Sequence, residues 1–345
     1  MNYAVLKSSI LYIMVPMIFV ALFTPLIKKV AFHIKAYDVP NGRRINQKPI
    51  PNLGGLAVVA GFLLGYMLFG EPSILMNAVL IGAFILVITG MVDSINPIPA
   101  KVKFIFQLIA VLVVVLYGNI NISKLTVLGY LIDFKWFTIP LTILFLLACI
   151  NSINFIDGMD GLSSGISAIY FITVGIISLM MGRVGIYYVI SLVMLGCTLG
   201  FLIHNFHPAD IFLGDAGSMF LGYIIGIVAL LGYKTIVLTS LVIPLLILAI
   251  PLLDVIFAII RRKLKGESMA TPDKSHIHHQ VLKRTSSQRQ AVLIIYLVQA
   301  LFSAASIVYV LHSPKLGYII YGILMVIVLV FILTTDVVFD FKKKK

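Results

Sequence analysis

The sequence predicts an all-α integral membrane protein with about eleven transmembrane helices. Three observations support this fold class. Hydrophobic residues make up 61% of the 345 positions and charged residues only 11%, whereas a soluble domain has about 25% charged residues. The apolar residues form runs long enough to cross a bilayer, and Lys and Arg gather in every second loop between them. We expect a single polytopic domain over residues 1–345.

Each predicted span is an apolar run of roughly 20 residues, because only a helix can pair all backbone polar groups inside lipid. The eleven runs are Ser9–Ile27, Leu53–Phe69, Ile74–Val92, Val102–Tyr117, Phe137–Ile150, Ile166–Met181, Val184–Ile203, Met219–Tyr233, Thr235–Ile260, Ala291–Leu311 and Leu316–Leu333. The first run is too long for a signal-peptide core, so it counts as a helix. Phe137–Ile150 and Met219–Tyr233 are short, but their uncharged flanks can extend them. Thr235–Ile260 contains Pro244 and Pro251, which predict a bent or broken helix.

The distribution of positive charge predicts the orientation of these spans. With eleven spans, alternate loops fall on opposite sides, and 20 of the 26 Lys and Arg residues fall on one side. That side is expected to be cytoplasmic, which places the N-terminus outside and the C-terminus in the cytoplasm. The net charge of +13 is then a topology signal and not a sign of nucleic-acid binding. Outside, the alternating pattern in Lys124–Phe137 predicts a small β-hairpin that turns near Gly129.

The densest polar cluster is NSINFIDGMDG, residues 151–161. Asn151, Asn154 and Asp157 repeat every three residues, which would stack them on one face of a helical turn, and Asp160 follows. The two glycines of the segment after Asp157 can end the helix and let the backbone approach a ligand. A polar cap with a turn is the alternative, but a cap needs only one Asn or Asp, so we favour a functional site.

A second cluster is HNFHPADIFLGDAGS, residues 204–218. Its Gly-Asp-x-Gly-Ser end precedes an apolar run and predicts a helix N-terminus with Asp215 close to it. Such a terminus attracts phosphate through its free N–H groups and the helix dipole. Taken alone, this segment is read equally well as a plain helix cap.

Three histidines, His276, His278 and His279, lie in a large basic loop that Lys and Arg already make soluble. Zinc is one reading, but no cysteine lies nearby. The carboxylates of these loops are hard oxygen ligands, which suit Mg²⁺ beside phosphate chemistry better. The histidines are then expected to bind or protonate phosphate oxygens.

Two further carboxylates belong to apolar runs. Asp93 ends the third run, with Lys101 and Lys103 beyond it, and it faces the other clusters across the same membrane surface. Asp254 lies inside the ninth run, shortly before Arg261. A carboxylate in a span has a functional or a paired role by default, and for Asp254 structural support by pairing with a basic residue is an equal alternative.

The first long loop is basic and turn-rich, and it contains Arg43, Arg44 and Lys48. It is either a positive-inside anchor or an anion-binding collar around the site. Gly54 and Gly55 at its end would allow close packing.

Together, DVPNGRR…KPIPNLGG, MVDS, NSINFIDGMDGL, HNFHPADIFLGDAGS and HIHH resemble the successive signatures of the polyprenyl-phosphate N-acetylhexosamine-1-phosphate transferases. The resemblance covers nearly the whole chain and is greater to the WecA/TagO branch of that family than to MraY. It implies transfer of N-acetylhexosamine-1-phosphate, above all GlcNAc-1-phosphate, from a UDP-sugar to undecaprenyl phosphate with release of UMP. It implies Mg²⁺ as cofactor, with Mn²⁺ as a substitute, and a bacterial plasma membrane with the active site facing the cytoplasm. A homodimer is left open.

The resemblance also implies residue roles. Asn154 and Asp215 would hold Mg²⁺, and Asp157 would help to organise the metal and the diphosphate. Asp160 would hydrogen-bond the uracil, and Phe212 would stack on it.

His276, His278 and His279 would line the phosphate or sugar side. Asp93 would face the lipid phosphate, as a base or as a positioning group. The other residues expected to bind substrate are Asn151, Arg43, Arg44, Lys48, Lys101 and Lys103.

Three positions depart from the family pattern. Ser94 stands where a second adjacent carboxylate is usual, Gln280 where a basic residue often follows the histidines, and Asn46 where His is common. A catalytically weak or silent member that acts as a scaffold is therefore an alternative to an active enzyme. A transporter is a further rival, but transporter sites lie near the midplane, whereas these motifs gather at one membrane face.

Overall fold

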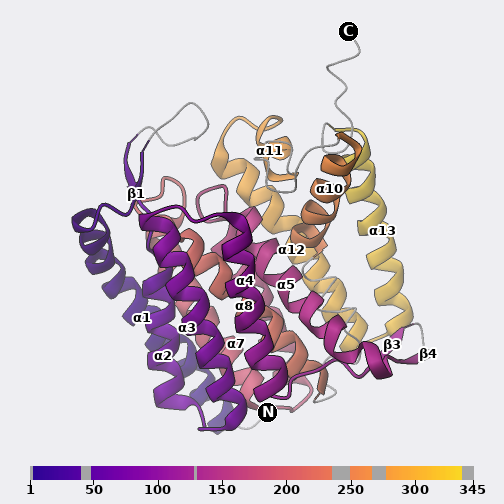
Figure 1. The fold of residues 1–345 in the computed structure, drawn as a ribbon. Helices are drawn as coiled ribbons and strands as arrows, with labels where there is room; N and C mark the ends of the chain where they lie inside the picture. Colours follow the sequence, from indigo (N-terminus) through magenta and orange to yellow (C-terminus); the bar gives the residue numbers. More distant parts are fainter. Residues whose placement is uncertain (1–2, 40–47, 128–129, 235–248, 266–276, 336–345) are drawn as a thin grey trace.

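The computed structural model describes residues 3–39, 48–127, 130–234, 249–265 and 277–335. Helices dominate this part of the chain and pack around one hydrophobic core (Figure 1). The α-helices are α1 (Tyr3–His33), α2 (Gly55–Phe69), α3 (Ile74–Ile95), α4 (Ala100–Leu112), α5 (Thr138–Ile156), α6 (Leu162–Met180), α7 (Ile186–Asn205), α8 (Gly214–Lys234), α10 (Ala249–Lys265), α11 (Ile277–Leu282), α12 (Gln288–Leu311) and α13 (Pro314–Leu333). A π-helical turn, η1 (Val113–Tyr117), continues α4, and a 3₁₀ turn, η2 (Lys135–Phe137), precedes α5.

Nine helices in the described ranges are long and apolar enough to cross a membrane. They confirm an all-α membrane protein, and the two short runs are indeed extended, to Lys135–Ile156 and Gly214–Gly232. Two of the eleven predicted spans are not among the nine. α2 is apolar but has only 15 residues. Most of the ninth predicted run, including Pro244, lies outside the described residues, and α10 begins at Ala249.

Helix α8 lies at the centre of the bundle. In the most apolar stretch of α8, 94% of the residues are buried, compared with 22% in the corresponding stretches of α1 and α13. The exposed sides of α1 and α13 carry apolar side chains. Small residues allow the backbones to approach, as is usual between membrane helices. A Cβ on Gly55 of α2 would overlap the Cα of Gly217 on α8, and one on Gly90 of α3 would overlap the backbone of Ala216. The close packing predicted for Gly55 is therefore present.

Two short antiparallel strand pairs lie at opposite ends of the bundle (Figure 1). β1 (Tyr37–Asp38) pairs with β2 (Ile50–Pro51) near the end where α11 lies. β3 (Lys124–Val127) pairs with β4 (Tyr130–Asp133) where the sequence predicts a hairpin, although the turn around Gly129 lies outside the described residues. The arrangement thus gives the molecule two distinct ends.

Candidate active site

An open cavity of about 1550 Å³ lies at the end of the bundle that carries β1, β2 and α11. It is formed where α3, α5 and α7 end and α6 and α8 begin, so the polar motifs between these helices meet there although they are far apart in the sequence. Among the residues that line it are Lys48, Asp93, Ser94, Asp157, Asp160, His207, Phe212, Asp215 and His279. Most of these were predicted as site residues.

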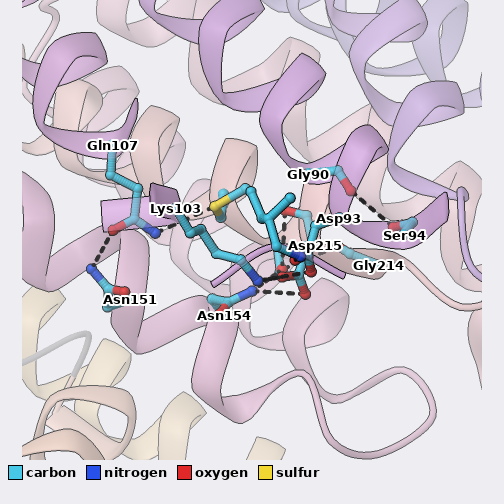
Figure 2. Close-up of polar contacts among 12 residues, drawn as sticks. Gly90, Asp93, Ser94, Lys103, Gln107, Asn151, Asn154, Gly214 and Asp215 are labelled. Atoms are coloured by element: carbon cyan, nitrogen blue, oxygen red, sulfur yellow. Dashed lines mark hydrogen bonds and ion pairs between the residues drawn. The ribbon is translucent and has the colours of Figure 1, made fainter. Parts of the chain in front are cut away.

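Lys103 joins two of the carboxylates (Figure 2). Its ammonium group lies 2.8 Å from Asp93 Oδ2 and is also hydrogen-bonded to Asp215 Oδ2. Asp93 is further fixed because its Oδ1 accepts a hydrogen bond of 3.0 Å from the Ile98 amide. The ammonium group of Lys103, in the first turn of α4, therefore joins the last turn of α3 to the first turn of α8. The first-turn position of Asp215 agrees with the predicted helix N-terminus.

Asn154 connects α5 to the same cluster. Its Nδ2 donates to Asp215 Oδ1 at 3.3 Å and to Ser218 Oγ at 2.8 Å. Among the described residues, its amide oxygen has no hydrogen-bond partner.

The donor set fits a hard divalent cation. No group of three His, Cys, Asp or Glu side chains in the described part of the chain is arranged to hold a metal. The oxygen donors are instead the carboxylates of Asp93 and Asp215, which already converge on one ammonium group, and the amide oxygen of Asn154, for which the described residues offer no partner. Carboxylate and amide oxygens are ligands that Mg²⁺ accepts.

Asp157 follows α5 directly and lines the cavity. Removal from water raises the pKa of its carboxyl to about 7, and the negative charges of Asp215 and Asp38 add to this effect. The hydroxyl of Ser163, in the first turn of α6, donates to Asp157 Oδ1 and lowers the pKa in part. Asp157 therefore changes its charge near neutral pH.

Gly161 ends the loop after Asp157 with a positive φ of 76°, and α6 begins at the next residue. A glycine adopts this left-handed conformation without strain, so the predicted helix break is present. Asp160, within the loop, also lines the cavity. Its Oδ2 accepts from His207 Nδ1 at 2.7 Å and from the Ala209 amide at 3.1 Å, whereas its Oδ1 has no partner among the described residues.

Other predicted residues lie apart from this cluster. Asn151 Nδ2 donates to Gln107 at 3.0 Å and to the Leu147 carbonyl at 2.8 Å, and Asn151 does not line the cavity (Figure 2). Lys101 is exposed and does not line it either. Of the histidines, His279 lines the cavity and His278 is buried behind it.

Arg43, Arg44 and His276 lie outside the described residues. Lys48 lies on the cavity wall.

Several residues of the site escaped the sequence analysis. His207 is hydrogen-bonded to Asp160, and Ser163 is hydrogen-bonded to Asp157. The ammonium group of Lys28, in α1, lies 3.4 Å from Asp210 on the cavity wall. His207 stands within a predicted motif, and Ser163 stands six residues after Asp157, so both could have been considered. Lys28 carries no local signal, because only the packing of α1 against α7 brings it there.

Comparison with known proteins agrees with these features. Residues 76–233 match the family model described as glycosyl transferase family 4. The chain is 42% identical over 297 residues to the probable undecaprenyl-phosphate N-acetylglucosaminyl 1-phosphate transferase of Bacillus subtilis (strain 168), covering 85% of this chain and 83% of that protein. It is 32% identical to the decaprenyl-phosphate N-acetylglucosaminephosphotransferase of Mycobacterium leprae (strain TN), covering 88% and 84%. It is 31% identical to the undecaprenyl-phosphate alpha-N-acetylglucosaminyl 1-phosphate transferase of Escherichia coli (strain K12), covering 84% and 81%.

Fold and site thus define a multi-pass membrane enzyme with a carboxylate-rich cavity at one end of its helix bundle. Within this class, the chain belongs to the polyprenyl-phosphate N-acetylhexosamine-1-phosphate transferases, as the motifs indicate.

Proposed function

We propose that this protein transfers GlcNAc-1-phosphate from UDP-GlcNAc to undecaprenyl phosphate and releases UMP. The observation that carries this proposal is the 42% identity over 85% of the chain to a relative named for this transfer. The geometry supports it, because a cavity at one end of a membrane helix bundle can admit a lipid phosphate from the bilayer and a soluble nucleotide from the water.

Mg²⁺ is the cofactor we propose, with Mn²⁺ as a substitute, and Asp215 and Asn154 would hold it. The bound ion would supply neutralisation of the charge that develops on the leaving phosphate. Lys103 is placed to contribute positive charge at the same point, because its ammonium group already lies between the two carboxylates.

The remaining cavity residues would bind and orient the two substrates. Asp160 Oδ1, which has no partner in the described part of the chain, can accept the N3–H of uracil, and Phe212 on the same wall offers a ring to stack on it. His279 and Lys48 would contact phosphate oxygens, and Asp93 would orient the acceptor phosphate or take up its proton. We further propose that this cavity opens to the cytoplasm of a bacterial cell, as the charge distribution predicts.

Purified protein incubated with undecaprenyl phosphate and a panel of UDP-sugars, with UMP release as readout, tests this function. We expect UMP only with UDP-N-acetylhexosamines, loss of the signal with a chelator and recovery with Mg²⁺. Asp215→Asn should abolish turnover and leave a protein that elutes as a single species in detergent. Absence of UMP release with every UDP-sugar would instead indicate a silent family member that serves as a scaffold.

A further inference from the structure

A buried carboxylate and a buried imidazole lie directly behind the cavity and take no part in the proposed chemistry. Asp254, in α10, is 1% exposed, and His278, in α11, is 3% exposed. Asp254 Oδ2 lies 3.4 Å from His278 Nδ1, and Asp254 Oδ1 accepts a hydrogen bond of 2.7 Å from the Ile277 amide at the start of α11. One side chain of α10 therefore fixes both the backbone and the imidazole of α11.

The other edge of this imidazole faces the loop that carries Asp157 and Asp160. A Cβ placed on Gly158 would lie 2.9 Å from His278 Nε2, so the ring rests against the loop backbone where only glycine leaves room for it. Its ring also lies 4.4 Å from that of His279, with the two planes at 44°. His278 thus touches both a loop and a histidine that line the cavity, although it does not line the cavity itself.

The burial of Asp254 and His278 is energetically costly, which suggests that the pair has a role other than stability. A carboxylate removed from water costs several kcal/mol unless neighbouring groups compensate, and an apolar pair of the same volume is often as stable. A carboxylate within ion-pair distance of one ring nitrogen favours one orientation of the imidazole, in which the other nitrogen is directed away from the carboxylate. Here the nitrogen turned away from Asp254 is the one at Gly158.

We propose that Asp254 and His278 are positioning residues, and that the pair sets the place of the Asp157–Gly161 loop and of the His279 ring at the cavity wall. In this proposal Asp254 acts through His278 and Ile277, and neither Asp254 nor His278 is assigned a contact with substrate. The kinetic consequence of this inference rests on the proposed transferase function, whereas its structural consequence does not.

Conservative variants test the pair. Asp254→Asn keeps an acceptor for the Ile277 amide but removes the charge beside His278, and His278→Phe keeps a ring but removes its nitrogens. We expect each to lower kcat for UMP release at least tenfold with a KM for UDP-GlcNAc within about threefold of wild type. The double variant should lose no more than the worse single variant, because both changes break one unit. Asp254→Glu should recover part of the rate.

Two matched controls lie far from the pair. Asp133→Asn removes an exposed carboxylate that accepts a hydrogen bond from the Lys135 amide in β4–η2, and His312→Phe changes an exposed histidine after α12. Both should leave kcat unchanged. Additive losses in the double variant, or kcat within twofold of wild type in either single variant, would overturn the inference.

A second measurement does not depend on activity. A nitroxide spin label on Ser286→Cys, an exposed cavity residue four positions after α11, reports the order of that segment in detergent. Asp254→Asn should increase the mobility of the label, and Asp133→Asn should not. An unchanged spectrum overturns the positioning role even if the enzyme is active, whereas a mobile label with no wild-type UMP release supports it and refutes only the proposed function.

Discussion

At the scale of single residues, the cluster of Asp93, Lys103 and Asp215 places one cation between two carboxylates. Ser94, beside Asp93, cannot add a charge, and its hydroxyl donates to the Gly90 carbonyl at 2.9 Å. A second carboxylate at this position would repel both Asp93 and the anionic acceptor. We therefore expect Asp93 and Lys103 to orient the acceptor phosphate without a second carboxylate.

This predicts the effect of two substitutions on kcat. Asp93→Asn should lower kcat by roughly 10²- to 10⁴-fold if Asp93 takes up a proton. Ser94→Asp should change kcat by less than about tenfold, which corresponds to about 1.4 kcal/mol of activation free energy. Steady-state UMP release measures both. If Asp93→Asn lowers kcat by less than tenfold, Asp93 is only a helix-end residue. If Ser94→Asp raises kcat by a large factor, the pair of adjacent carboxylates is indispensable.

Asp157 gives a prediction about pH. Its pKa of about 7 lies above the ordinary value of 3.8, so in the folded protein it is protonated below neutral pH and charged above it. This group stabilises the fold least at high pH, because the unfolded chain releases the proton first as pH rises. If the charged form organises the diphosphate, kcat/KM should rise with pH through about 7.

Ser163 provides the internal check on this pH profile. Its hydroxyl stabilises the charged form of Asp157, so Ser163→Ala should move the rising limb of kcat/KM to higher pH. Ser167→Ala, one turn later in α6, removes a hydroxyl that bonds only within the helix and should leave the limb in place. A limb that stays unmoved in Ser163→Ala would assign the titration to another group.

At the scale of elements, glycines decide how closely α2 and α3 approach α8. Gly55→Ala places a methyl group into the backbone of Gly217, and we expect it to lower stability by about 1–3 kcal/mol. Gly322→Ala in α13, where nothing lies within 4 Å of the added Cβ, should be neutral or stabilising by about 0.5–1 kcal/mol. Thermal unfolding in detergent compares the two. Equal melting temperatures would mean that α2 can move away without cost.

The elements also show what the sequence could and could not predict. Motif spacing predicted Asp215 near a helix N-terminus and Asn154 on one face of a helical turn with Asn151 and Asp157, because both predictions depend only on local periodicity. Asp215 does lie in the first turn of α8, and Asn154 donates to it. The partner of Asn151 could not be predicted, since Gln107 meets it only through the rotation of α4 against α5. In the same way, nothing in the order His278-His279 tells which ring is buried, because the packing of α11 on α10 decides it.

At the scale of the whole molecule, the two ends of the bundle differ in charge and in content. The cavity and α11 lie at one end, and β3 and β4 lie at the other. The positive-inside rule predicts that the cavity end faces the cytoplasm. A single cysteine at Ser286 should then resist an impermeant thiol reagent in intact cells, while one at Ser123 should react, and both positions are exposed. Labelling at position 286 but not at position 123 would show that the orientation is the reverse of the predicted one.

The contacts of the Asp157–Gly161 loop have a consequence for the order of assembly during synthesis. Among the described residues, the hydrogen bonds and ion pairs of the carboxylate cluster join side chains that lie between Asp93 and Ser218. The loop, however, meets His278 of α11 at Gly158, and Tyr296 of α12 donates a hydrogen bond to the Gly161 carbonyl. Both partners are synthesised after α8, which ends at Lys234. A nascent chain that has inserted α8 would therefore contain the whole carboxylate cluster but would lack the contacts that α11 and α12 make with the Asp157–Gly161 loop. We expect the enzyme to become active only after these last helices have been inserted.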